Sequence, residues 1–165
     1  MEEPRVRDDG LQVEEHPGFQ RAFWVTQRVA WVVFGVVLLL ALAGLTGGGG
    51  YLAQGTVVVG GAEVRYPRVA RWEAADELRV AFPAGAEVHR LTLGGAFLDH
   101  YAVEAAMPRP HRALGTEAGL ALEFAGQAGE PLHAVLQLRP LRPGMPRFAV
   151  TADGASAEVN AVILP

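Results

Sequence analysis

The chain has 165 residues, a formal net charge of −4 and neither cysteine nor lysine. These absences exclude disulfides, thiol catalysis and cysteine-ligated metals, as well as a Schiff-base lysine and a P-loop lysine. The charge is weakly acidic and evenly spread along the chain, so it indicates neither nucleic acid nor a strongly cationic partner.

Residues 1–16 are charged and lack apolar periodicity, which predicts a disordered tail. Pro17 suits the first turn of a helix, and Glu14 and Glu15 suit the positive end of a helix dipole. We therefore expect a continuous helix over residues 17–46.

The middle of this predicted helix, Val29–Leu45, is uncharged and almost wholly apolar. At 1.5 Å per residue it is roughly 25 Å long, close to the thickness of a bilayer core, so it predicts a transmembrane helix and a lipid bilayer as a partner. A cleaved signal peptide is the alternative, because Ala41-Leu42-Ala43 fits a cleavage site. Residues 1–28 would then form a long, net acidic leader, which favours an uncleaved anchor.

Five residues at the start of the helix, Arg21, Trp24, Arg28, Trp31 and Gly35, follow a spacing that places them on one face. We call this set the helix stripe. One interpretation is interfacial anchoring, with Trp at headgroup level and Arg reaching lipid phosphates. The other is a face that docks on another integral membrane protein, where Gly35 allows close approach.

The basic residues predict an orientation. Arg21 and Arg28 lie on the N-terminal side of the apolar run, whereas the first basic residue after it is Arg65. The positive-inside rule then places the N-terminus in the cytoplasm and the C-terminal part outside the membrane.

After the helix, Gly47–Gly50 predict a Gly-rich tether over residues 47–55. From residue 56 to 165, short alternating runs separated by turn signals predict one antiparallel β-sandwich, immunoglobulin-like in shape, with a small β-barrel as the alternative. The expected strands are Thr56–Val59, Glu63–Tyr66, Glu77–Phe82, Val88–Leu93, Phe97–Glu104, Gly119–Phe124, Leu132–Arg139, Arg147–Thr151 and Ala157–Leu164.

Residues that carry chemistry are sparse in this domain. His89, His100, His111 and His133 show no metal-ligand spacing, and Ser156 is not in a nucleophile elbow. We predict no catalytic residues, no cofactor and no metal, and a protein that is not an enzyme. A hydrolase using His and Asp or Glu is the least supported alternative.

One basic and aromatic cluster, Arg65, Tyr66, Arg68, Arg71 and Trp72, follows the tether closely in sequence. It fits a solvated edge strand interrupted by Pro67. It also fits a membrane-proximal surface that contacts lipid phosphates or a partner.

The segment FWVTQRVAWVVFGVVLLLALAGLTG, followed by a short strand-rich domain, resembles uncharacterised bacterial single-pass inner-membrane proteins with a small β-rich periplasmic domain. The resemblance implies a location in the bacterial inner membrane and no particular activity. We therefore expect an accessory, assembly or stabilising subunit of an inner-membrane complex. The alternative is an anchored periplasmic module that binds a small ligand or an envelope polymer.

Overall fold

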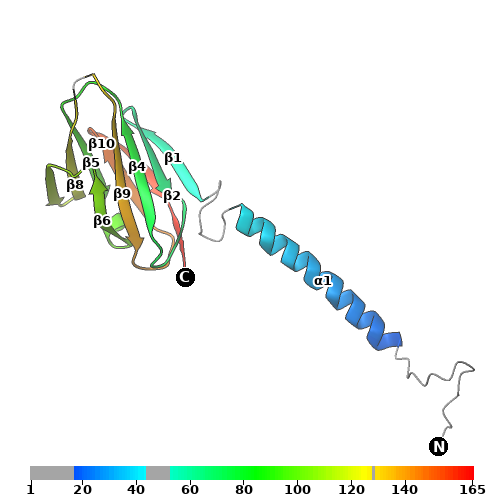
Figure 1. Cartoon of the computed structure of the whole chain (residues 1–165). Coiled ribbons are helices and arrows are strands. Elements are labelled where there is room, and N and C mark those ends of the chain that lie inside the picture. Colours follow the sequence, from blue (N-terminus) through cyan, green and yellow to red (C-terminus); the bar gives the residue numbers. More distant parts are fainter. Residues whose placement is uncertain (1–16, 44–52, 128) are drawn as a thin grey trace, which may run out of the picture. The chain divides into compact units, whose positions relative to one another are not determined.

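The computed structural model contains one N-terminal helix and an all-β domain, which fall into two compact units (Figure 1). It describes residues 17–43, 53–127 and 129–165. The predicted disordered tail and residues 47–52 of the predicted tether lie outside the described residues.

Helix α1 runs from Pro17 to Leu42. The sequence predicted a helix to residue 46, but residues 44–46 lie outside the described part of the chain. The segment Gly18–Leu42 is long and apolar enough to cross a membrane. By position and composition, α1 is a candidate for either a membrane anchor or a signal sequence.

The β-domain contains two five-stranded antiparallel sheets and one short parallel pair. Sheet A has the order β1-β2-β4-β9-β6, sheet C has the order β11-β10-β5-β8-β7, and β3 pairs with β12. The strands are β1 (Gln54–Val59), β2 (Ala62–Pro67), β3 (Val69–Arg71), β4 (Asp76–Phe82), β5 (Val88–Gly94), β6 (Tyr101–Met107), β7 (Arg112–Thr116), β8 (Gly119–Ala125), β9 (Leu132–Pro140), β10 (Arg147–Ala152), β11 (Ala155–Asn160) and β12 (Val162–Leu164).

This topology confirms an all-β domain of antiparallel sheets and excludes the small barrel. Strands β1 and β6 are the edges of sheet A, and β11 and β7 are the edges of sheet C, so neither sheet closes on itself. The immunoglobulin-like shape stays a prediction. Strand β1 begins at Gln54, inside the predicted tether, because Gln54 and Gly55 pair with Pro67 and Tyr66 of β2.

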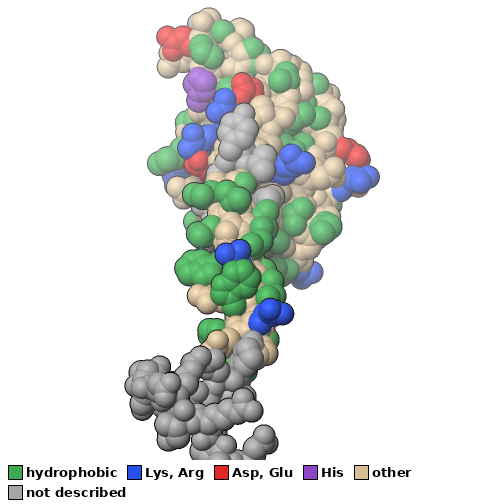
Figure 2. Space-filling model, turned by 90° about the vertical axis from the view of Figure 1, so that its right-hand side faces the viewer, with side chains coloured by type: hydrophobic (Ala, Val, Ile, Leu, Met, Phe, Trp, Pro, Cys, Tyr) green, Lys and Arg blue, Asp and Glu red, His purple; other side chains and the backbone are tan. Residues whose placement is uncertain are grey.

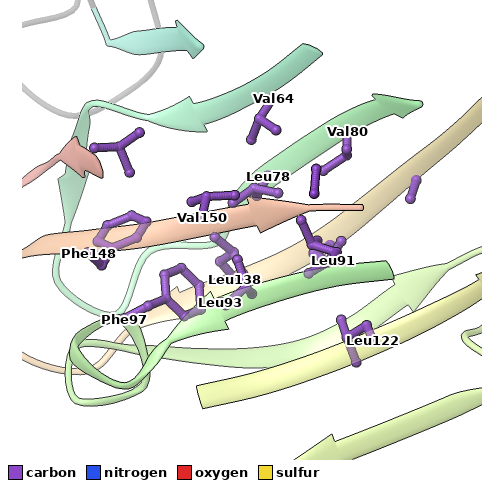
Figure 3. Close-up of a cluster of buried hydrophobic side chains, with 14 of the residues drawn as sticks. Val64, Leu78, Val80, Leu91, Leu93, Phe97, Leu122, Leu138, Phe148 and Val150 are labelled. Carbon is purple, nitrogen blue, oxygen red and sulfur yellow. The ribbon is translucent and has the colours of Figure 1, made fainter. Parts of the chain in front are cut away.

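One hydrophobic core fills the space between the two sheets. Alternation along the strands directs apolar side chains inward, as in β9, where Leu136 and Leu138 are buried while Gln137 and Arg139 are exposed. Figure 3 shows side chains such as Leu78 of sheet A and Leu93 and Val150 of sheet C meeting in this core.

An aromatic cluster closes one end of the core, beside the short helix α2 (Gly95–Leu98). Phe97 stacks on Tyr101 with ring centroids 4.9 Å apart and meets Phe148 edge-on at 5.1 Å. The Tyr101 hydroxyl is buried without a hydrogen-bond partner among the described residues. Burial, together with the nearby Asp76 carboxylate, raises the pKa of Tyr101.

Two of the predicted strands were wrong. Residues 97–104 do not form one strand, because the chain crosses from sheet C to sheet A there and α2 buries Phe97 at the crossing. Residues 157–164 form two strands in different pairings, separated by the buried Ala161. Strands β3 and β7 were not predicted.

Candidate interaction surfaces

All five residues of the helix stripe lie within α1, where the helical repeat puts them on one side. Trp24 and Trp31 are 54% and 70% exposed, and the Arg28 guanidinium carbon sits 4.0 Å from the centre of the Trp24 ring, within cation–π range. In the space-filling view, hydrophobic side chains cover the helix, with basic ones among them (Figure 2). The exposed surface of α1 is therefore largely apolar, and its two arginines, Arg21 and Arg28, lie in its N-terminal half.

A shallow groove of about 390 Å³ runs beside the helix stripe. It is lined by Gln27, Ala30, Trp31, Phe34 and Leu38. Gly35 lies next to it, and a Cβ added at Gly35 would meet no atom within 4 Å. This part of the helix therefore has room for the side chains of a neighbouring helix.

The basic and aromatic cluster predicted from the sequence is divided in the structure. Arg65 lies on the outer face of sheet A, with its Nε 2.7 Å from Glu63 Oε1, whereas Tyr66 is half-buried and packs beneath Gly55. Because β2 lies between β1 and β4, it is not the edge strand that one interpretation required.

The rest of this cluster lies in β3 and in the residues on either side of it. Arg68 and Arg71 are exposed, and Trp72 is 48% exposed. The Trp72 indole donates a hydrogen bond of 3.1 Å to the carbonyl of Leu141. Trp72 therefore joins a surface formed with a distant loop rather than with Arg65 and Tyr66.

A second surface, which we call the β6–β7 cleft, lies between the edge strands of the two sheets. Its volume is about 780 Å³, and its lining includes the apolar side chains of Ala106, Met107, Ala113 and Leu120. Met107 is 69% exposed, and every residue of β7 is exposed. The sequence did not predict this cleft, because β7, which forms one of its walls, lacks the alternating polarity that marks a strand.

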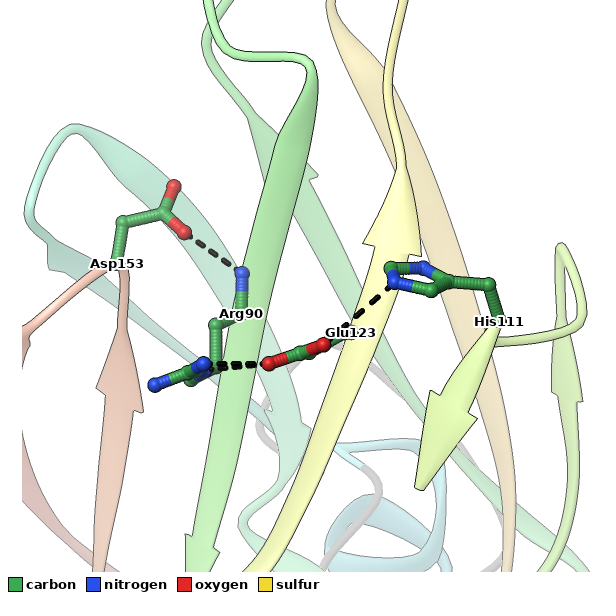
Figure 4. Close-up of polar contacts among 4 residues, drawn as sticks. All are labelled: Arg90, His111, Glu123 and Asp153. Atoms are coloured by element: carbon green, nitrogen blue, oxygen red, sulfur yellow. Dashed lines mark hydrogen bonds and ion pairs between the residues drawn. The ribbon is translucent and has the colours of Figure 1, made fainter. Parts of the chain in front are cut away.

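A small charged cluster, centred on Arg90 and Glu123, lies on the outer face of sheet C (Figure 4). The Arg90 guanidinium donates hydrogen bonds to Glu123 Oε1, and Nε2 of His111 lies 3.5 Å from Glu123 Oε2. The Glu123 side chain is only 8% exposed. The hydrogen bond from Arg90, with the charges of Arg112 and His111, lowers the pKa of Glu123.

We expect Glu123→Gln to reduce stability near neutral pH and to reduce it less in acid. The folded-state pKa of Glu123 is below its ordinary value of 4.5, so its stabilising contribution is present above pH 4.5 and is lost as pH falls through the lowered pKa. Thermal unfolding followed by circular dichroism over this range measures the difference. Glu130→Gln, at an exposed turn, is the matched control and should show no such change. A Glu123→Gln effect that does not vary with pH would contradict the assigned ion pair.

The histidines play separate roles. His89 is 1% exposed, stacks on Phe82 with ring centroids 4.6 Å apart, and places Nδ1 2.7 Å from Asp153 Oδ2. Asp153 Oδ1 also accepts a hydrogen bond of 2.7 Å from the Arg90 backbone amide. His89 therefore fastens β5 to the β10–β11 turn, whereas His100 and His133 are not buried. The described residues contain no group of three or more His, Asp or Glu placed to hold a metal ion.

Comparisons with known proteins give little further information. No protein-family model matches the chain, and no curated protein matches it. Among solved structures, the chain is similar to one described as the crystal structure of BslA, a bacterial hydrophobin, with 12% identity over 62% of this chain and 95% of that chain and a TM-score of 0.33. A TM-score this low carries no argument about fold or function.

Proposed function

We propose that this chain is a membrane-anchored accessory, assembly or stabilising subunit of a bacterial inner-membrane protein complex. The N-terminus lies in the cytoplasm, α1 spans the membrane, and the β-domain lies in the periplasm. Another integral membrane protein is the partner, and the helix stripe and the β-domain supply the contacts. The subunit acts by binding and needs no cofactor or nucleic acid.

Gly35 is the observation that carries this proposal. A glycine inside a helix costs about 1 kcal/mol relative to alanine. A Cβ at Gly35 would have open space around it, so the fold of the described chain does not require glycine there. Small residues in membrane helices allow a second helix to approach closely, and Gly35 lies in the helix stripe beside the groove. Docking of a partner helix accounts for this glycine.

Purification of the tagged full chain from its native membranes in mild detergent tests the proposal. We expect wild type to co-elute with a specific membrane protein and Gly35→Leu to retain about tenfold less of it, a loss of about 1.4 kcal/mol, because the leucine side chain blocks close approach of the partner helix. Trp24→Ala should also weaken retention.

The matched control is Val33→Leu, which adds bulk about 200° away around the helix. This variant should keep the partner. Recovery of wild type as a lone monomer, or equal retention by Gly35→Leu and Val33→Leu, would contradict the proposal.

The β6–β7 cleft favours a second candidate function, an anchored periplasmic module that binds a small ligand or an envelope polymer. A concave, largely apolar site of this size is typical of small-molecule binding. A shift in the unfolding temperature of the full chain by one ligand class, abolished by Leu120→Glu in the cleft, would support this function over the first.

A further inference from the structure

Three exposed apolar side chains lie on two neighbouring connections at one end of the β-domain. Trp72, Leu141 and Met145 are 48%, 46% and 83% exposed. They come from two connections, one between β3 and β4 and the other between β9 and β10. The Trp72 indole bonds the Leu141 carbonyl, so the two connections lie side by side. We call these three residues the Trp72 patch.

Backbone hydrogen bonds hold the Trp72 patch in place. The Trp72 amide donates to the Leu164 carbonyl at 2.7 Å, and Gly144 and Ile163 exchange two backbone bonds of 3.0 and 2.8 Å. Both connections are therefore fixed against β12. Because these bonds hold its backbone in place, the Trp72 patch keeps its apolar side chains exposed to water. Exposed apolar patches of this kind mark sites that interact with a protein or a membrane.

The Trp72 patch lies close to the point where the chain enters the β-domain. Ala53, the first described residue of the domain, accepts hydrogen bonds from the amides of Arg68 at 2.7 Å and Val69 at 3.0 Å. Val69 begins β3, which leads directly to Trp72. At about 3.3 Å per strand residue, Trp72 is roughly 10 Å from Val69.

Chain length limits how far this end of the domain can move from α1. Ten residues separate Leu42, the last residue of α1, from Ala53. Eleven extended steps span at most about 40 Å. If α1 is held in a bilayer, a short covalent link of this kind gives the β-domain an effective concentration on the order of millimolar at the bilayer surface. Even a weak affinity of this end for lipid is then sufficient to keep it bound.

The chemistry of the Trp72 patch suits the surface of a bilayer. Tryptophan is enriched at membrane–water interfaces, where the ring is partly buried and the indole N–H is bonded. The two segments that form the patch, 68–73 and 141–146, contain Arg68, Arg71 and Arg142 against Glu73. This net positive charge of two is confined to the two segments, because Asp76 and Glu77 follow at the start of β4, and Asp99 and Glu117 lie on other connections at the same end. Arginines beside an apolar patch attract anionic lipid headgroups.

We propose that the Trp72 patch rests on the outer surface of the bilayer that α1 spans. This inference depends on the anchor in the proposed function, and it assigns the patch to lipid rather than to a protein partner. Trp72, Leu141 and Met145 enter the interfacial layer, while Arg71 and Arg142 contact lipid phosphates. The opposite end of the domain then faces away from the membrane.

Fluorescence quenching in vesicles tests the inference on the full chain. The protein has three tryptophans, so Trp24→Phe with Trp31→Phe leaves Trp72 as the only one. In vesicles of phosphatidylcholine and phosphatidylglycerol, we expect phosphatidylcholine brominated near the headgroup to quench Trp72. The Leu141→Glu, Met145→Glu double variant should lose this quenching, whereas Leu114→Glu, on the exposed strand β7, should keep it.

Two further single-tryptophan chains separate the possible failures. Val88→Trp, with the three native tryptophans changed to Phe, reports on the opposite end of β5 at a half-exposed position and should not be quenched. A chain that keeps only Trp31 reports on the anchor. Quenched Trp31 with unquenched Trp72, or equal quenching of Trp72 and Val88→Trp, overturns the inference and leaves the anchor intact. Unquenched Trp31 overturns the anchor and the inference together.

Discussion

Alanine at Gly119 is expected to destabilise the β-domain by at least about 3 kcal/mol. Gly119 begins β8 with a φ of +127°, which L side chains rarely adopt. A Cβ there would lie 1.9 Å from the Leu93 carbonyl oxygen and 2.8 Å from the Gly94 carbonyl carbon. Both are backbone atoms of the paired strand β5, so no rotation of a side chain relieves the clash. Thermal or urea unfolding of the full chain in detergent, followed by circular dichroism, measures the loss.

Gly115→Ala is the matched control for this experiment. Gly115 lies on the neighbouring strand β7, opposite Leu120, where a Cβ would meet nothing within 4 Å. The change should alter stability by less than about 0.5 kcal/mol, or raise it slightly. Equal stability of Gly119→Ala and Gly115→Ala would contradict the close approach of β5 and β8 at this point.

Phe97→Ala should cost about 3–5 kcal/mol, the usual range for truncation of a buried aromatic side chain. Phe97 is fully buried in α2 and packs against Tyr101 and Phe148, so its removal leaves a cavity between the two sheets. The same unfolding measurement reports the loss. The neighbouring Leu98 is 39% exposed, and Leu98→Ala should cost about 1 kcal/mol or less. A larger loss for Leu98→Ala than for Phe97→Ala would show that α2 faces the other way.

Local periodicity predicted the parts of the fold that depend on local sequence. In β4, the alternating Leu78, Val80 and Phe82 indicated one inner face, and all three are buried. The helix stripe was likewise visible in the spacing, because a helical repeat brings residues three and four apart onto one side. These features need no knowledge of distant residues.

The features missed from the sequence depend on contacts between distant segments. The apolar stretch that begins at Phe97 has the composition of a strand, but the crossing between sheets required a turn of helix there. Strand β7 has no alternation, and only its pairing with β8 defines it. The Trp72 patch joins residues 69 positions apart, so the sequence did not show that its two halves lie side by side.

Photo-crosslinking from the groove beside the helix stripe, within native membranes, tests most directly whether this chain is a subunit of a membrane complex. Leu38 lies three residues after Gly35 and lines the groove, whereas Val33 lies on the opposite side of α1. We expect a photoreactive phenylalanine analogue at Leu38 to yield a defined crosslinked protein band that the same analogue at Val33 does not. Equal crosslinking at the two positions, or none at either, would contradict the account.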